Sequence, residues 1–249
     1  MRKRLNPDNP MLKTVAIIPA AGAGVRMGTG HAKQFLDFEG RPLLAITLEK
    51  FHLSPMIDGI IAVVPAADVD YCRREIIDRY ALSKVTKIVK GGERRQDSVR
   101  LGIEASGGAY GLVLIHDGVR PLIRLELIER VVIAARKDRA VIAALPAKET
   151  VKGVDGNHLV TRTYDRQQVW LVQTPQVFRY EDIFMAHKRA VEEGWEEVTD
   201  DALLIERVGI PVRVIEGSED NIKITTPHDL EMARFLLKKN IEYRMFNDK

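Results

Sequence analysis

The chain of 249 residues contains one cysteine, Cys72. No internal disulfide is therefore possible, and a reducing compartment is expected. Aromatic residues make up 6% of the chain, and the formal net charge is +3, from 38 basic and 35 acidic residues. Proteins that bind single-stranded nucleic acids combine basic grooves with stacking aromatic side chains. This composition therefore excludes no enzyme, but it argues against a nucleic-acid partner.

The sequence also lacks an apolar run near the roughly 18 residues that a membrane span needs. Met1–Arg4 is basic, as at the start of a signal peptide, but polar, turn-forming Leu5–Pro10 follows where an apolar segment would be required. We therefore expect a cytoplasmic protein without a membrane partner, whose residues 1–12 form a loose tail. A chain of this length can bury a large core without a disulfide or a metal ion.

Short apolar runs rich in β-branched residues alternate with segments of helical periodicity. The predicted strands are Val15–Pro19, Ile60–Val64, Val85–Val89, Leu112–His116 and Val141–Leu145. The predicted helices between them cover residues 42–52, 66–80, 97–104 and 125–139. Because these strands are almost continuously apolar, both of their faces should be covered. The pattern predicts an α/β fold with a mostly parallel, doubly wound sheet.

The alternation stops after Pro146, where "KETVKGVDGNHLVTRTY" places an Asp155-Gly156 turn between two polar, alternating segments. This pattern predicts a β-hairpin, and its polarity indicates an arm that protrudes from the core, over about residues 147–166. Further elements are expected over residues 180–193 and 200–208 (helices), over 212–215 and 222–225 (a strand pair), and from Pro227, a helix capped by Thr226. We expect one domain over residues 1–249.

The first predicted strand leads into a loop of small residues, "PAAGAGVRMGTGHAK", that contains Arg26 and Lys33. Gly22 and Gly24 match the start of the dinucleotide fingerprint G-x-G-x-x-G, but Met27 stands at its third glycine position, and no glycine here continues as a P-loop. Glycine-rich backbone with added cations suits a triphosphate. An ordinary strand-to-helix turn with solvated charges is the alternative.

Four further stretches accompany this loop: "GGERRQDSV" (91–99), "HDGVRP" (116–121), "DRQQVWLVQTPQVF" (165–178) and "EGSEDNIKITTPHDL" (216–230). Together and in this order, the five resemble the motif set of the 2-C-methyl-D-erythritol 4-phosphate cytidylyltransferase family of the non-mevalonate isoprenoid pathway. The resemblance implies a nucleotide-binding α/β domain with a protruding arm. It also implies transfer of a cytidylyl group from CTP to methylerythritol phosphate, which yields 4-diphosphocytidyl-2-C-methyl-D-erythritol and pyrophosphate.

The resemblance also implies roles for individual residues. Catalytic contacts with the phosphates are implied for Arg26, Lys33 and Lys223. Nucleotide binding is implied for Ala20, Ala21, Gly22, Gly92, Glu93, Ser98 and Asp117. Sugar-phosphate binding is implied for Asp117, Thr150 and Arg166, the last two from the arm of a partner subunit in a homodimer. Asp117 is further implied as a ligand of Mg²⁺, with Arg120 as a buttress of its loop. Many relatives carry aspartate at position 93 and two alanines at Gly118-Val119.

This reaction needs no catalytic base, because the attacking group is a phosphate monoester whose second pKa is about 6. The difficulty is to bring two anions together, which cations solve by positioning them and neutralising their charge. His116 lies in a predicted strand, so we expect a hydrogen-bonded core histidine and not a ligand. The last predicted helix is soon followed by Lys249, so we expect no fused second enzyme.

Two other functions stay open. A ribitol 5-phosphate cytidylyltransferase shares this fold, but such relatives tend to have Leu-Ala-Gly-Gly after the first strand and Asn-Glu-Thr in the second motif. This chain has Pro19–Gly22 and Gln96–Ser98 there, and it has Thr199–Ala202 close to a Thr-Asp-Glu-Ala stretch of the methylerythritol group. A non-catalytic nucleotide-binding regulator would be expected to lose the cations that grip phosphate.

Overall fold

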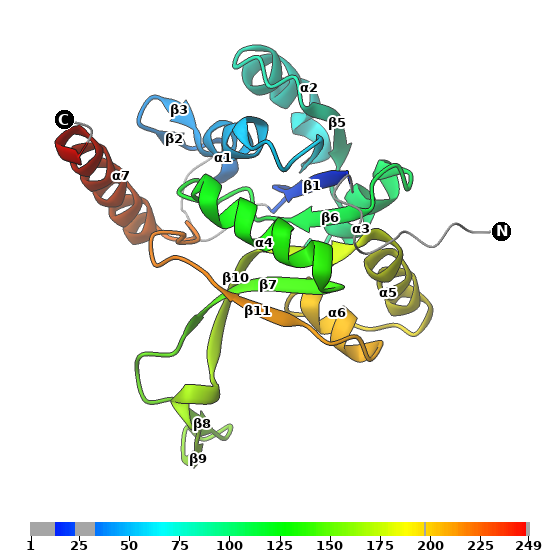
Figure 1. Ribbon diagram of the computed structural model, residues 1–249, viewed down its shortest axis with the longest axis vertical. Helices are drawn as coiled ribbons and strands as arrows, with labels where there is room; N and C mark the ends of the chain where they lie inside the picture. The colour runs from blue at the N-terminus through cyan, green and yellow to red at the C-terminus, as the bar shows by residue number, and fades with distance from the viewer. Residues whose placement is uncertain (1–12, 23–32, 197, 248–249) are drawn as a thin grey trace.

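The computed structural model describes residues 13–22, 33–196 and 198–247. Arg26 and the predicted tail over residues 1–12 lie outside the described residues. A seven-stranded sheet runs through the structure, helices pack on both of its faces, and a hairpin projects away from it (Figure 1). The α/β class and the protruding hairpin are confirmed. In these ranges no helix has the length and apolar character of a membrane span.

The five predicted strands are all present. They are β1 (Thr14–Pro19), β4 (Gly59–Val64), β5 (Val85–Lys90), β6 (Leu112–Ile115) and β7 (Ala140–Pro146). The sheet order is β11-β7-β10-β6-β1-β4-β5, with β11 (Arg213–Glu216) at one edge. The pairs β1–β4, β1–β6, β4–β5 and β7–β11 are parallel. The prediction of a mostly parallel sheet is therefore confirmed.

One long strand, β10 (Trp170–Arg179), was not predicted. It pairs antiparallel with β6 on one side and with β7 on the other, and its register against β7 shifts between Val172 and Gln176. The intervening Gln173-Thr174-Pro175 breaks the apolar pattern, and a proline inside an apparent strand is normally evidence against one. The strand continues across the irregularity because residues 170–172 pair with β7 before it, and residues 176–178 pair with both β6 and β7 after it.

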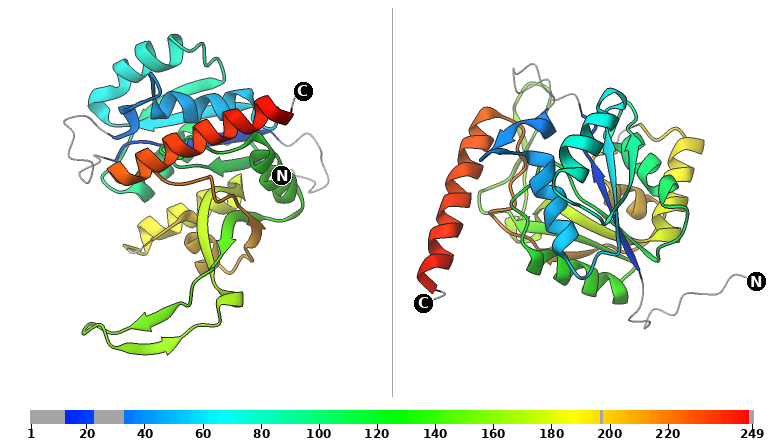
Figure 2. Two further views of the ribbon diagram at one scale, coloured as in Figure 1. Left: turned by 90° about the vertical axis from the view of Figure 1, so that its left-hand side faces the viewer. Right: turned by 90° about the horizontal axis from the view of Figure 1, so that it is seen from above.

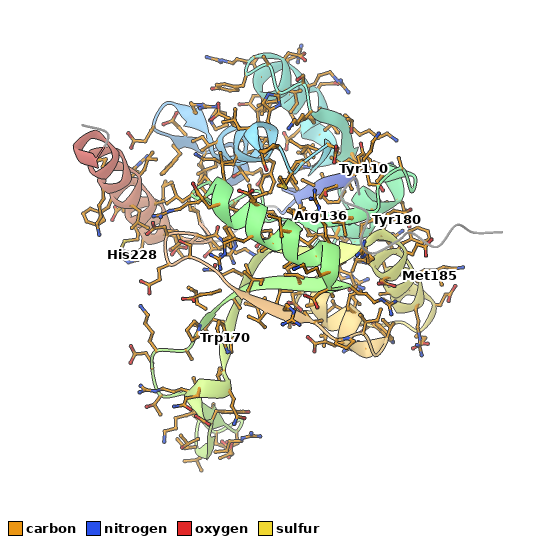
Figure 3. All side chains as sticks on the ribbon, in the orientation of Figure 1. Tyr110, Arg136, Trp170, Tyr180, Met185 and His228 are labelled. Atoms are coloured by element: carbon orange, nitrogen blue, oxygen red, sulfur yellow. The ribbon has the colours of Figure 1, made fainter. Side chains whose placement is uncertain are left out.

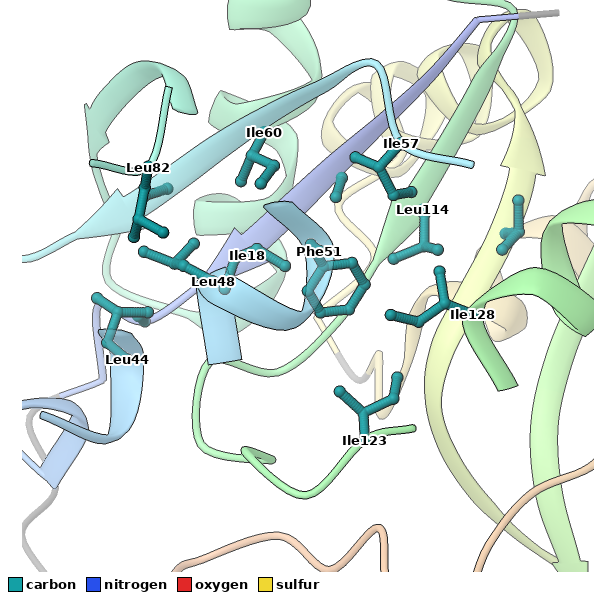
Figure 4. Packing of buried hydrophobic residues seen from close by; sticks show 14 of the residues in the cluster. Ile18, Leu44, Leu48, Phe51, Ile57, Ile60, Leu82, Leu114, Ile123 and Ile128 are labelled. Atoms are coloured by element: carbon teal, nitrogen blue, oxygen red, sulfur yellow. The ribbon is translucent and has the colours of Figure 1, made fainter. Parts of the chain in front are cut away.

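Helices cover both faces of the sheet, and alternate side chains of each central strand point to one face or the other. Ala16 and Ile18 of β1 face one apolar cluster, while Val15 and Ile17 face the other, as the two-residue period of a strand requires. The first cluster packs against α1 (Leu43–Leu53) and α4 (Leu125–Lys137), and the second against α3 (Arg95–Ser106), α5 (Tyr180–Glu192) and α6 (Asp201–Arg207). Figure 4 shows Phe51 of α1 at the centre of the first cluster.

Two segments differ in detail from the prediction. The helix expected over residues 66–80 consists of a 3-10 turn (Ala66–Asp68), a short α2 (Val69–Tyr71) and a π-helical segment (Cys72–Asp78). The small antiparallel pair β2 (Asp37–Phe38) and β3 (Arg41–Pro42) was not predicted. It packs against the start of the last helix, α7 (Pro227–Asn247), which begins where predicted.

The predicted cap of α7 is present. Thr226 Oγ1 accepts a hydrogen bond from the amide of Asp229 at 3.2 Å, and Asp229 Oδ2 accepts one from the amide of Thr226 at 2.8 Å. These reciprocal bonds satisfy donors that a helix start leaves free.

The predicted hairpin arm is formed by β8 (Lys152–Val154) and β9 (Val160–Thr163). At its turn, Asp155 Oδ1 accepts hydrogen bonds from the amides of Asn157 (2.9 Å) and Leu159 (3.0 Å). The arm leaves the sheet after Pro146 and returns at Trp170, which lies at its base (Figures 2 and 3).

The prediction of a strand over residues 222–225 is wrong, because this segment joins no sheet. Instead, the amide of Ile224 donates to the carbonyl of Val119, in the loop after β6, at 2.9 Å. The Ile224 side chain is buried, while Lys223 turns to the opposite side, toward Asp117. The apolar–polar alternation that suggested a strand therefore reflects a buried Ile224 next to a Lys223 that faces the loop after β6.

The close packing of α3 on the sheet predicts that Gly102→Ala destabilises the protein. A Cβ at Gly102 would lie 2.5 Å from Ile17 Cγ2 and 3.1 Å from Val63 Cγ2. Alanine favours helices, but overpacking of this kind costs about 1–3 kcal/mol, and we expect a net loss in urea denaturation. The matched control is Gly156→Ala in the arm, where nothing lies within 4 Å of the added Cβ. Equal or greater stability of the Gly102 variant would contradict this packing.

Candidate active site

The carboxyl ends of β1 and β6 lie side by side, because these strands pair in parallel from Thr14 and Leu112 to Ile17 and Ile115. From β1 the chain runs through α1 on one face to β4. It returns from β5 through α3, on the opposite face, to β6 on the other side of β1. The strand order therefore reverses between β1 and β6. Open α/β sheets bind ligands at such a point.

A pocket opens at this edge of the sheet, between the loop after β1, the start of α3 and the loop after β6. Eight of the residues singled out in the sequence line it: Ala20, Ala21, Gly22, Gly92, Glu93, Ser98, Asp117 and Lys223. They come from four segments far apart in the chain. The structure therefore brings together most of the residues to which the resemblance gave a nucleotide or phosphate role.

The floor of this first pocket depends on a close approach of two loops. A Cβ on Gly91 would lie 2.1 Å from Ala21 Cβ and 2.8 Å from Ser98 Oγ, so a larger residue would push the loops apart. Ser98 Oγ accepts a hydrogen bond from the amide of Gly92 at 3.1 Å. The loop therefore ends against the first turn of α3, whose N-terminal amides favour an anion.

Asp117 is the centre of the charged groups at this site. Its side chain is 8% exposed, and three cationic side chains surround it. Arg95 Nε lies 3.1 Å from Oδ1, Lys223 Nζ lies 3.0 Å from Oδ2, and Arg120 Nε lies 3.4 Å from Oδ2. The cations come from α3, from the 221–224 segment and from the loop after β6. One carboxylate therefore fixes three separate parts of the chain.

Burial and charge act in opposite directions on these groups. Burial alone would raise the pKa of Asp117, but Arg95, Lys223 and Arg120 together hold it well below the usual value for aspartate. Burial lowers the pKa of Arg120, and Asp117 opposes that shift. Asp117 is thus ionised at neutral pH, and it serves as a fixed negative charge and not as a proton acceptor.

The position of Asp117 is fixed by Thr174 in the irregular part of β10. Thr174 Oγ1 accepts a hydrogen bond from the Asp117 amide at 3.1 Å. The same oxygen lies 3.1 Å from His116 Nδ1, while His116 Nε2 lies 3.2 Å from the carbonyl of Arg120. Since that carbonyl can only accept, Nε2 carries the proton, and the Thr174 hydroxyl donates to Nδ1.

His116 is therefore a neutral structural residue, as the sequence suggested. It is fully buried, and burial lowers its pKa to about 3.

The segment that carries Lys223 is held in place by Asn221. Arg120 Nη1 donates to the carbonyl of Asn221 at 2.7 Å, and Asn221 Nδ2 donates to the carbonyl of Thr174 at 2.7 Å. Asn221 is completely buried, whereas the Lys223 side chain is 38% exposed. The backbone beside Lys223 is thus fixed while its ammonium group can reach solvent or a ligand.

A second pocket lies on the other side of this charged group, between β10, α6 and the loop after β6. It shares Arg95, Asp117 and Lys223 with the first pocket and adds Arg120 and Thr174. Apolar lining comes from Ile142, Val172 and Leu203. The ion pairs of Asp117 therefore form a wall common to two pockets, so two ligands could meet there.

The remaining predicted residues lie elsewhere. Lys33 begins a 3-10 turn, Lys33–Phe35, near the first pocket's Gln34. Thr150 and Arg166 belong to the base of the arm and line neither of these two pockets. Arg166 Nη1 donates to the carbonyl of Lys148 at 3.1 Å. Within one chain, the arm residues are not brought to the site.

Two residues in direct contact with Asp117, Arg95 and Thr174, were given no role from the sequence. Arg95 was part of a quoted motif but was given no role, because neighbouring Arg94 and Arg95 cannot be told apart in the sequence. In the structure Arg94 pairs at the surface with Asp97, while Arg95 reaches Asp117. Thr174 was hidden in the unpredicted strand β10.

The expectation that Asp117 binds Mg²⁺ directly does not fit its surroundings. Both of its oxygens are engaged by cationic side chains, which would also repel a divalent ion. Across the described part of the chain, no group of three or more His, Cys, Asp or Glu side chains is placed to hold a metal ion. Asp117 is therefore better suited to holding the three cations than to binding a metal ion.

The lowered pKa of Asp117 predicts how stability depends on pH. A carboxylate whose pKa is lower in the folded than in the unfolded state stabilises the fold above the unfolded value, and this contribution is lost as the pH falls. At pH 7, the free energy of unfolding of Asp117→Asn should be about 3–5 kcal/mol lower than that of the wild type. Below about pH 4 this difference should shrink by up to about 1.4 kcal/mol per pH unit.

Urea denaturation of both proteins between pH 7 and pH 3 measures this difference. Asp138→Asn, which removes the carboxylate of a half-exposed pair with Arg213, controls for the loss of an ordinary ion pair. A constant gap between wild type and Asp117→Asn at all pH values would contradict the role given to Asp117.

Comparison with known proteins agrees with this geometry. The family model of IspD, 2-C-methyl-D-erythritol 4-phosphate cytidylyltransferase, matches residues 14–239. The enzymes of that name from Geobacter metallireducens and Syntrophus aciditrophicus are 45% and 46% identical over 229 and 227 residues. The matches cover 91% of this chain in each case, and 98% and 97% of those proteins.

Solved structures show the same relationship. The 4-diphosphocytidyl-2C-methyl-D-erythritol synthase of Anaerococcus prevotii superimposes with a TM-score of 0.81 at 35% identity, covering 91% of this chain and 96% of that one. The 2-C-methyl-D-erythritol 4-phosphate cytidylyltransferase of Thermus thermophilus superimposes with a TM-score of 0.73 at 32% identity, covering 91% and 100%. The chain belongs to the 2-C-methyl-D-erythritol 4-phosphate cytidylyltransferase family of nucleotidyltransferases.

Proposed function

We propose that this enzyme transfers the cytidylyl group of CTP to 2-C-methyl-D-erythritol 4-phosphate through the wall that its two pockets share. The observation that carries this proposal is the position of Lys223, Asp117 and Arg95, which line both pockets. A displacement at phosphorus needs the attacking and leaving groups on opposite sides of the reacting atom. Two pockets that meet at one set of cations provide that arrangement.

The nucleotide would occupy the first pocket. Its triphosphate would lie against the loop after β1 and the first turn of α3, with Arg26 and Lys33 as further phosphate contacts. The ribose and base would lie near Gly92, Glu93 and Ser98. Lys223 is the cation best able to move, since its side chain is 38% exposed, and it would contact the α-phosphate.

The sugar phosphate would occupy the second pocket, where its phosphate can approach Arg120 and Lys223. Its oxygen attacks the α-phosphorus, a new phosphorus–oxygen bond forms, and the bond to pyrophosphate breaks. The attacking oxygen is already ionised, so Asp117 need not accept a proton. Its role would be to hold Arg95, Arg120 and Lys223 where the negative charge develops.

The apolar side chains Ile142, Val172 and Leu203 favour the methylerythritol phosphate over ribitol 5-phosphate. They give an otherwise polar pocket a surface against which a methyl branch can pack. Ribitol has no such branch. A single methyl group in an apolar site contributes about 1–3 kcal/mol to discrimination.

A homodimer would complete the site, with Thr150 and Arg166 reaching the sugar phosphate of the partner subunit. In support, the arm projects away from the sheet (Figure 2), and neither Thr150 nor Arg166 lines the two pockets of its own chain. The strand at its base exposes Trp170 (39%) and Leu171 (58%). Contiguous exposed apolar side chains are typical of an interaction surface.

Magnesium would accompany the triphosphate, since phosphate oxygens and water commonly supply most of its ligands. The cytoplasmic location, inferred from the single cysteine and from the lack of a signal segment and a membrane span in the sequence, stays a prediction. So does the single domain over residues 1–249.

The first test of this proposal follows pyrophosphate release with CTP, magnesium and either sugar phosphate. We expect turnover with 2-C-methyl-D-erythritol 4-phosphate and little with ribitol 5-phosphate. Lys223→Gln should lower kcat by about a hundredfold or more, because one charge contact to the transition state is lost. Lys87→Gln is the matched control, on edge strand β5, where Lys87 Nζ contacts the carbonyl of Ala105.

Turnover only with ribitol 5-phosphate would indicate the sister activity. Binding of CTP without release from either substrate would indicate a regulator.

A second test asks whether the arm acts in the partner subunit. Arg166→Gln and Lys223→Gln subunits, each of low activity, are unfolded together and refolded as mixed dimers. If the arm serves the partner, each mixed dimer has one intact site, and random mixing should restore about a quarter of wild-type activity. An arm that serves its own chain gives no recovery, and sedimentation as a monomer would contradict the dimer itself.

A further inference from the structure

Arg95 joins two buried carboxylates that come from different parts of the fold. Its Nε donates to Asp117 Oδ1 at 3.1 Å, and its Nη1 donates to Asp201 Oδ2 at 2.8 Å. Asp201 is the first residue of α6 and is 1% exposed. It lines neither of the two pockets and has received no role so far.

The position of Asp201 does not depend on Arg95 alone. Gln176 Nε2 donates to Asp200 Oδ2 at 2.7 Å, and Gln176 Oε1 accepts from the amide of Ala202 at 3.2 Å. Asp200 Oδ1 also accepts from the amide of Leu203 at 3.1 Å, which caps α6. These bonds fix the start of α6 on β10. Asp201 is therefore a rigid support against which Arg95 is held.

The charges around Asp201 explain why such a support matters. Besides Arg95, its one other charged or titratable neighbour among the described ion pairs is His187 of α5, whose Nε2 lies 3.4 Å from Oδ1. Without the Asp201 charge, the Arg95 guanidinium group would lose its second partner, and Asp117 would attract both of its donor nitrogens. A guanidinium group readily binds both oxygens of one carboxylate. It would then compete with Lys223 for Asp117 Oδ2, which Lys223 now approaches at 3.0 Å.

We propose that Asp201 is a positioning residue for cytidylyl transfer, which holds Arg95 to one oxygen of Asp117 and thereby leaves the other oxygen to Lys223. It touches neither substrate and acts through Arg95. The inference rests on the proposed function, because Lys223 is the group whose position it controls. It also links α6, which borders the second pocket, to the cations of the first.

Asp201→Asn tests this role, because asparagine keeps the shape and removes the charge. With CTP and methylerythritol phosphate, kcat should fall about ten- to a hundredfold, as expected for coupled neighbours. The KM for CTP should change by less than about threefold, since Asp201 lies outside the nucleotide pocket. Asp182→Asn is the matched control. It also removes a carboxylate from an arginine pair, with Arg139, and should keep the wild-type kcat.

A double-mutant cycle with Arg95→Lys separates positioning from a general effect on folding. Lysine keeps the charge but lacks the fork that contacts two carboxylates, so this variant should lose about as much kcat as Asp201→Asn. If Asp201 acts through Arg95, adding Asp201→Asn to Arg95→Lys should lower kcat no further.

The inference would be overturned if the losses in kcat were additive in the double variant, or if a folded Asp201→Asn enzyme kept the wild-type kcat. If Asp201→Asn does not fold, a wild-type kcat in Arg95→Lys would overturn it instead. An inactive wild-type enzyme would instead contradict the proposed function.

Discussion

The ion pairs of a single buried carboxylate hold this site together. Asp117 is exposed by only 8% at its side chain, and its charge would be very costly there without Arg95, Arg120 and Lys223. Each cation comes from a different segment, and each segment borders a pocket. The loop after β6, the start of α3 and the 221–224 segment are therefore placed by the same interaction that places the charges. The same ion pairs therefore stabilise the fold and position the cations.

This arrangement explains how the site can work with few titrating groups. The one histidine beside Asp117 is neutral and supports the loop, and Asp117 stays ionised. What remains is a set of fixed positive charges at the junction of two pockets. In the proposed reaction such charges would need no reorganisation as the α-phosphorus becomes five-coordinate, which is where preorganised electrostatics lowers a barrier most. Under the proposed function, the partial exposure of Lys223 would let this one cation follow the reacting phosphate.

The sequence predicted the parts of the fold that repeat a simple pattern. The apolar runs of β1, β4, β5, β6 and β7 were visible because strands buried on both faces read as continuous apolar stretches. β10 was missed because Gln173-Thr174-Pro175 interrupts its apolar pattern. Residues 222–225 were predicted as a strand because apolar and polar residues alternate there, but in the structure this alternation buries Ile224 and turns Lys223 toward Asp117. Eight pocket residues were found through motifs. The role of Arg95 depends on which of two adjacent arginines turns inward. This is decided by the packing of α3 on β1 and β4, which directs Arg95 toward Asp117 and Asp201.

A crystal structure of the enzyme with a CTP analogue that cannot be cleaved between its α- and β-phosphates tests the central claim most directly. The account predicts the triphosphate in the first pocket, Lys223 Nζ moved from Asp117 to the α-phosphate, and Arg95 and Arg120 still paired with Asp117. The face of the α-phosphorus opposite the leaving group should open to the second pocket. An α-phosphate distant from Lys223, or an Asp117 released by its two arginines, would contradict the account.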